Sequence, residues 1–105
     1  MIKTFILKKG DQLSFKITFM QDVQIDSMEF GVKKEYTDED FTILKSIGNG
    51  IFKIDSRNYQ IVVSSDEMNE LDIFSYIYDI RYRSGSVVKT PLSGKIIIKE
   101  SVFDG

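Results

Sequence analysis

The stretch LDIFSYIYDIRY, residues 71–82, has an aromatic side chain at nearly every second position: Phe74, Tyr76, Tyr78 and Tyr82. Alternate residues of a β-strand point to the same face of the sheet, so these aromatic side chains would share one face. Aromatic residues that alternate with polar ones are typical of a strand with one buried side. The stretch therefore predicts a long strand that faces the core, rather than an exposed aromatic platform for sugars.

The segment directly before this strand, SSDEMNEL at residues 64–71, is the one helical candidate in the sequence. Ser64 and Glu67 have the spacing of a capping box, and Met68 and Leu71 would lie on one face of the helix. At about two turns, the helix would connect two strands rather than form a layer of its own.

The spacing of Asp72, Phe74, Tyr76 and Tyr78 resembles the D-x-A-x-Y-x-C stretch of immunoglobulin-like domains. By this resemblance Tyr76 would form a tyrosine corner, in which the ring is buried and the hydroxyl bonds to the backbone of the preceding turn. Tyr78 stands where the cysteine of that stretch would be, so an aromatic ring would fill the core in place of a disulfide. The chain has no Cys and no Trp, which separates it from antibody-type domains.

The rest of the chain has the same period of two, most clearly in LSFKITF at residues 13–19. Seven or eight such segments predict an all-β fold: an immunoglobulin-like antiparallel β-sandwich of seven to eight strands with one short helical turn. We expect residues 1–105 to form a single domain of this kind. The predicted core includes Leu13, Phe15, Ile17, Phe30, Ile61, Val63, Tyr76, Tyr78 and Ile80.

Turn residues predict where the strands are joined or interrupted. Gly48-Asn49-Gly50 is typical of a hairpin turn, and the tetrapeptide at residues 55–58 would join a second hairpin. Gly31 would mark a bulge in its strand. Pro91 has no N–H to donate, so it places the last strand at a sheet edge or at a bulge.

Composition argues against several kinds of function. Fourteen basic and sixteen acidic residues give a net charge of −2, which disfavours nucleic acid as a partner. Without His or Cys, and with an acidic run at residues 38–40 that lacks the spacing of a calcium loop, we expect no catalytic residue, no cofactor and no metal. The sequence has no apolar run of membrane-spanning length and no signal peptide, so we expect no membrane partner and synthesis in the cytoplasm.

Alternation also leaves some apolar side chains on the outside of the predicted strands. Ile77 would face outward, as would Ile97, which lies between two inward-facing isoleucines. Such residues on an edge strand either pair with another chain or are covered by a terminal segment of the same chain, and both alternatives remain open. We predict a partner-binding surface at Ile77, Arg81 and Ile97.

The segment YIYDIRYRSGSVVKTPLSGKIIIKESV, residues 76–102, resembles a module of bacteriophage tails. It is similar to the N-terminal domain of phage baseplate upper proteins and related tail-fibre proteins, most specifically from Tyr76 to Gly94. The resemblance implies a structural protein of a tail or baseplate that docks to other virion proteins or to copies of itself. It also implies location in the virion, after assembly in the bacterial cytoplasm.

An alternative function is a carbohydrate- or ligand-binding β-module. Aromatic residues near predicted turns would supply its binding surface, and the candidates are Tyr36, Phe41 and Tyr59.

Overall fold

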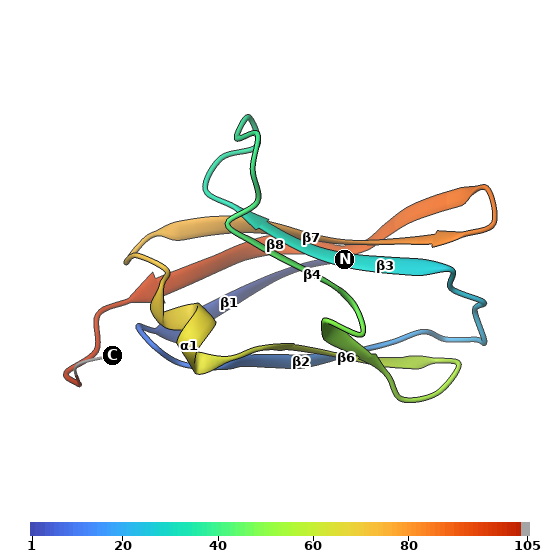
Figure 1. The fold of residues 1–105 in the computed structure, drawn as a ribbon, viewed down its shortest axis with the longest axis horizontal. Coiled ribbons are helices and arrows are strands. Elements are labelled where there is room, and N and C mark those ends of the chain that lie inside the picture. The colour runs from blue at the N-terminus through green and yellow to red at the C-terminus, as the bar shows by residue number, and fades with distance from the viewer. Residues whose placement is uncertain (104–105) are drawn as a thin grey trace.

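The computed structural model describes residues 1–103 and contains eight β-strands and one short helix (Figure 1). The elements are, in chain order, β1 Ile2–Lys8, β2 Leu13–Thr18, β3 Ser27–Lys33, β4 Ile43–Ile47, β5 Gly50–Lys53, β6 Asn58–Val63, α1 Ser65–Asn69, β7 Ser75–Ser84 and β8 Val87–Lys99. Among the described residues, no helix has the length and apolar character needed to span a bilayer.

The strands form two packed layers, which Figure 1 shows one above the other. One layer has the order β1-β8-β7-β3-β4, with β1 parallel to β8 and the other neighbours antiparallel. The second layer has the order β5-β6-β2 and is antiparallel. Two parallel residue pairs between β4 and β5 join the layers into one continuous hydrogen-bonded order. The fold is therefore an all-β, immunoglobulin-like sandwich, as predicted. It is not antiparallel throughout, as the prediction had it, because the β1–β8 and β4–β5 pairs are parallel.

The core lies between the layers and contains most of the residues predicted for it. Seven of the nine are buried: Leu13, Phe30, Ile61, Val63, Tyr76, Tyr78 and Ile80. Phe15 and Ile17 are partly buried and pack against this core. They lie on β2, the outer strand of the smaller layer, which has a neighbouring strand on one side only among residues 1–103.

Tyr76 forms the predicted tyrosine corner. Its ring is buried, and its hydroxyl oxygen accepts a hydrogen bond of 2.9 Å from the backbone N–H of Asp72. Tyr78, at the cysteine position of the immunoglobulin pattern, is also buried and donates a hydrogen bond of 2.7 Å to the carbonyl of Lys3. Its ring centre lies 5.6 Å from those of Phe5 and Phe30, so aromatic packing replaces a disulfide at this position.

Helix α1 closes one end of the sandwich. Ser64 is its N-cap and accepts a hydrogen bond from the backbone N–H of Glu67, as the capping-box spacing predicted. Met68 and Leu71 are both buried against the core. At the other end of the helix, Lys9 donates to the carbonyl of Asn69, the last helical residue, and to that of Leu71 over 2.5 Å. These bonds satisfy a helix-end acceptor and place a cation at the negative end of the helix.

Two predictions made from glycine positions are wrong: the hairpin turn at residues 48–50 and the bulge at Gly31. Gly48-Asn49-Gly50 does form a turn, with Gly48 and Gly50 at φ +86° and +90°, but the strands that it joins are parallel and belong to different layers. It is therefore a crossing between layers and not a hairpin. Gly31 lies in regular register and forms no bulge; instead, a Cβ on this residue would lie only 2.4 Å from the ring of Phe41.

The prediction for Pro91 is confirmed in one of its two forms. The register between β7 and β8 shifts between Ile80 and Tyr82, and the extra residue on β8 falls at Thr90 and Pro91, which is a bulge. Beyond the bulge β8 is not an edge strand, because β1 pairs with it from Ser93 to Lys99. The N-terminal segment thus covers β8, which was one of the two alternatives for this strand.

Candidate functional site

The candidate functional surface is the outer face of the β1-β8-β7-β3-β4 layer. The side chains that point away from the core here include apolar residues and charges of both signs. They are Glu29, Lys33, Leu44, Ile77, Asp79, Arg81, Lys95 and Ile97, together with Phe41 from the loop between β3 and β4.

All three residues of the predicted partner-binding surface lie on this outer face. Ile77 is paired with Lys95 and Ile97 with Ser75, so the two isoleucines are diagonal neighbours across β7 and β8, and both are partly buried. Arg81 is exposed and lies four residues further along β7. It forms an ion pair of 2.9 Å with Glu29 on β3. The structure therefore brings Ile77 and Ile97 together, with Arg81 at a distance from them.

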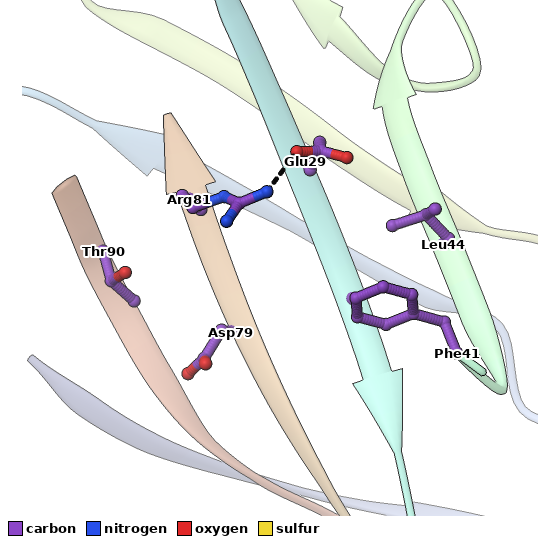
Figure 2. A pocket seen from close by; sticks show the side chains of 7 residues that line it. Glu29, Phe41, Leu44, Asp79, Arg81 and Thr90 are labelled. Atoms are coloured by element: carbon purple, nitrogen blue, oxygen red, sulfur yellow. Dashed lines mark hydrogen bonds and ion pairs between the residues drawn. The ribbon is translucent and has the colours of Figure 1, made fainter. Parts of the chain in front are cut away.

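Phe41 divides the region between Ile77 and Arg81 into two shallow hollows. Its ring lies over the backbone of Gly31, in the space that a side chain at that position would fill (Figure 2). One hollow, of about 240 Å³, lies on the Arg81 side and is lined also by Leu44 and Thr90. The other, of about 260 Å³, lies on the Ile77 side and is lined also by Lys33 and Tyr36. Gly31, Phe41 and Asp79 are common to both hollows.

Of the two cations near Phe41, Lys33 lies against the ring and Arg81 is paired with a carboxylate. Lys33 places its ammonium nitrogen 4.7 Å from the centre of the Phe41 ring and donates to the carbonyl of Asp38 over 2.7 Å. Arg81 is turned toward Glu29 (Figure 2), while Asp79, two residues away on the same strand, lines both hollows. Aromatic residues and arginine are enriched in protein–protein interfaces, whereas Lys, Asp and Glu are depleted there, so Phe41 and Arg81 are the residues here that favour an interface.

Sequence reasoning missed Phe41, Leu44 and Asp79 as parts of this surface. Phe41 lies in an irregular loop, where alternation gives no direction to a side chain. The one available signal was Gly31, a residue without a side chain inside an otherwise apolar strand, which can mark the close approach of another group. The predicted bulge at Gly31 does not account for the ring that covers this residue.

The three aromatic residues proposed for ligand binding do not lie together. Tyr36 is 78% exposed and Phe41 49% exposed, and both line the hollow on the Ile77 side. Tyr59 is buried on β6, with its ring centre 6.1 Å from that of Phe19, and burial raises the pKa of its hydroxyl. The inclusion of Tyr59 was therefore wrong, because its strand position faces the core.

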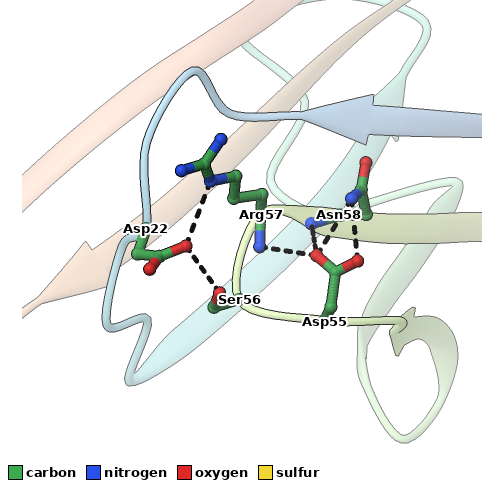
Figure 3. A network of polar contacts seen from close by, with 5 residues as sticks. All are labelled: Asp22, Asp55, Ser56, Arg57 and Asn58. Atoms are coloured by element: carbon green, nitrogen blue, oxygen red, sulfur yellow. Dashed lines mark hydrogen bonds and ion pairs between the residues drawn. The ribbon is translucent and has the colours of Figure 1, made fainter.

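Two other acidic residues, Asp22 and Asp55, are engaged in holding loops in place (Figure 3). Asp22 accepts hydrogen bonds from Ser56 and Arg57. Both bonds lower its pKa, and the bond from Ser56 has the larger effect. Asp55 accepts from the backbone N–H groups of Arg57 and Asn58 and from the Asn58 side chain, and these bonds lower its pKa. Within residues 1–103, no group of three or more acidic side chains is placed to hold a metal ion.

Comparison with known proteins adds no relative. A scan against protein-family models finds no family that matches the chain, and a search of curated proteins finds no match.

Proposed function

We propose that this chain is a structural protein of a bacteriophage or prophage tail or baseplate, where it acts as a protein–protein docking module and not as an enzyme. The observation that carries the proposal is the likeness of residues 76–94 to the phage module. The residues that carry the likeness have structural roles here: Tyr76 closes the tyrosine corner, and Gly94 lets β1 lie against β8. The expected location is the virion.

The outer face supplies the surface for docking in this proposal. Ile77 and Ile97 offer partly exposed apolar area at one end, and Phe41 offers a half-exposed ring at the centre. Arg81 lies beyond Phe41, where its ion pair with Glu29 is more than half exposed on the arginine side. A partner would bury the apolar residues for most of the binding energy, while exposed charge pairs of this type contribute little to affinity and mainly favour one orientation.

The proposal is tested by looking for the chain in particles. Prophages of the source organism are induced, the released particles are purified, and the chain is quantified by mass spectrometry. We expect it at a copy number that fits the three- or sixfold symmetry of tails and baseplates. Abundant, well-formed particles that lack the chain would refute the proposal.

The docking surface is tested by substitution. Ile77→Lys together with Ile97→Lys places two charges on the outer face and should reduce incorporation of the chain into particles by at least tenfold. Ile47→Lys is the matched control, because Ile47 is also partly exposed but lies at the end of β4 next to the crossing between layers. Equal incorporation of the double variant and the control, with both folded, would place the docking surface elsewhere.

The second candidate function is a carbohydrate- or ligand-binding module, which the hollow between Tyr36 and Phe41 favours. Exposed aromatic rings beside a carboxylate, here Asp79, suit the apolar faces and hydroxyls of a sugar. A glycan-array screen tests this candidate. Binding that is lost in Phe41→Ala and kept in Tyr59→Phe would support it, and no binding above background at millimolar ligand would exclude it.

A further inference from the structure

The outer edge of β1 is an open sheet edge. Successive residues of a strand direct their backbone groups to opposite sides, and the carbonyl of Met1 and the N–H of Lys9 both point to β8, where they bond to Ser93 and Lys99. Odd-numbered residues of β1 therefore pair with β8, and Ile2, Thr4, Ile6 and Lys8 turn their backbone groups outward. Within residues 1–103, no other strand pairs with this edge.

The turn after β1 closes only the last of these four residues. Asp11 donates its backbone N–H to the carbonyl of Lys8 and accepts the N–H of Lys8 through its carboxylate, both over 3.0 Å. Ile2, Thr4 and Ile6 are thus left with outward N–H and C=O groups. Each such residue can exchange two hydrogen bonds with a strand that adds to the edge.

The side chains along this edge favour addition of a strand. Ile2 is 82% exposed and Ile6 61% exposed, and both lie on the outer face, with Ile6 paired with Ile97 of β8. The other outer strand of the sheet order, β2, shows the contrast, because its outward side chains are Ser14, Lys16 and Thr18. A lysine at the centre of an edge strand discourages pairing, whereas exposed isoleucines promote it.

We propose that the edge of β1 pairs with β1 of a second copy of this chain, antiparallel about a twofold axis at Thr4. This register places Thr4 opposite Thr4 of the second copy and Ile2 opposite its Ile6, so all three open residues form hydrogen-bonded pairs, with about six hydrogen bonds in all. Each exposed isoleucine then gains an apolar neighbour across the axis.

Charge is compatible with this twofold register. Lys3 lies opposite Phe5 of the second copy, and the Lys3 ammonium already lies 5.4 Å from the centre of the Phe5 ring in its own chain. Lys8 extends past the end of the paired segment of the second strand, so no lysine lies directly opposite another lysine. The strand is thus complementary to itself, which is the requirement for a symmetric twofold interface.

The pairing area of two seven-residue strands is small, so the dimer is weak by itself. We expect a dissociation constant on the order of 100 µM, a range in which high local concentration decides whether the dimer forms. The inference does not depend on the proposed viral role, because it concerns the purified chain alone.

The self-association is tested by sedimentation velocity on the purified chain between about 10 µM and 1 mM, a span chosen for weak interfaces. Thr4→Pro removes the central outward N–H without taking a hydrogen bond from the pairing with β8, and should weaken association at least tenfold. Ile54→Lys is the control, because Ile54 lies in the turn between β5 and β6 and is 56% exposed, close to the 61% of Ile6. A chain that stays monomeric at the highest concentration, or a Thr4→Pro variant that associates like the wild type, overturns the proposal.

The register is tested by disulfide formation, which the absence of natural cysteines makes clean. Thr4→Cys should form dimers under mild oxidation much faster than Lys16→Cys on β2. A mixture of Ile2→Cys and Ile6→Cys should cross-link, whereas Ile2→Cys alone should not, because its two sulfur-bearing residues would be about 13 Å apart. Equal rates for Thr4→Cys and Lys16→Cys would contradict the proposed edge, and fast cross-linking of Ile2→Cys alone would contradict the register.

Discussion

At the scale of single residues, two tyrosine hydroxyls fix the strand that identifies the fold. Tyr76 ties β7 to the turn before it, and Tyr78 ties β7 to β1 across β8. Both rings are buried, and within residues 1–103 every buried side-chain nitrogen or oxygen has a hydrogen-bond partner. Tyr76 and Tyr78 are thus part of the core, with polar tips that specify which segments meet. Tyr82 is partly buried against the core. The prediction was wrong for Phe74, which precedes β7 and is 40% exposed, because the alternation of the strand begins only at Ser75.

Removal of one hydroxyl tests the tyrosine corner. Tyr76→Phe keeps the ring but deprives the N–H of Asp72 of its acceptor, so we expect the free energy of unfolding to fall by about 1 kcal/mol. Tyr36→Phe, at an exposed position, should change it by less than about 0.5 kcal/mol. Urea unfolding measures both, and equal effects would show that the corner bond does not stabilise the fold.

The ionisation of Tyr78 should lower the free energy of unfolding at alkaline pH. Burial, with a smaller effect of Asp79, raises the pKa of Tyr78 to about 12. The unfolded chain ionises near the ordinary value of about 10, so stability from this residue is complete below pH 10 and is lost as the pH rises from 10 toward 12. Tyr59 and Tyr76 act in the same direction, because burial raises their pKa values too.

Urea unfolding at several pH values checks this limit. The free energy of unfolding of the wild type should fall between pH 10 and 12, and that of Tyr78→Phe should fall less steeply. The two should have similar slopes between pH 7 and 9. Identical slopes above pH 10 would mean that Tyr78 ionises freely in the folded chain.

At the scale of elements, the pairing of β1 with β8 depends on one glycine. Gly94 has φ +155°, and a Cβ there would lie 2.0 Å from the carbonyl oxygen of Lys3. Backbone cannot move aside as a flexible side chain can, so β1 would have to leave its position.

Gly94→Ala should therefore lower the free energy of unfolding by at least about 2 kcal/mol and speed hydrogen exchange in residues 2–8. Gly85→Ala is the matched control: Gly85 has φ +59° with open space around its Cβ position, so its cost is about 1 kcal/mol from backbone strain alone. Urea unfolding and hydrogen exchange measured by mass spectrometry compare the two variants. A Gly94→Ala chain as stable as Gly85→Ala would show that β1 does not need the close approach.

Alternation in the sequence predicted the strands and most of the core, because a half-buried strand leaves a period of two in its residues. Alternation did not predict contacts between segments that are distant in the sequence. The turn at residues 48–50 has the residues typical of a hairpin, yet the two strands that it joins are parallel and belong to different layers. The ring of Phe41 covers Gly31 of β3 from the loop between β3 and β4, a contact that no local pattern of residues indicates. The outward direction of Ile77 and Ile97 was predictable, but the ring at the centre of the surface was not.

At the scale of the whole molecule, the outer face and the edge of β1 belong to the same layer of the sandwich. Ile6 on the edge strand is paired with Ile97, which in turn is diagonal to Ile77, so apolar side chains extend from the edge toward Phe41. The proposed dimer would join two such outer faces in one extended sheet. A tail protein with these two surfaces would contact its own copies at the edge and another protein on the face.

Lysine footprinting on purified particles tests docking through the outer face most directly. Lys95 lies on that face opposite Ile77, and Lys16 is exposed on β2 in the other layer. Acylation rates of both are measured by mass spectrometry in the free chain and in particles. We expect assembly to slow the acylation of Lys95 several-fold and to leave that of Lys16 unchanged. Absence of the chain from abundant particles, or a Lys95 as reactive in them as in the free chain, would contradict it.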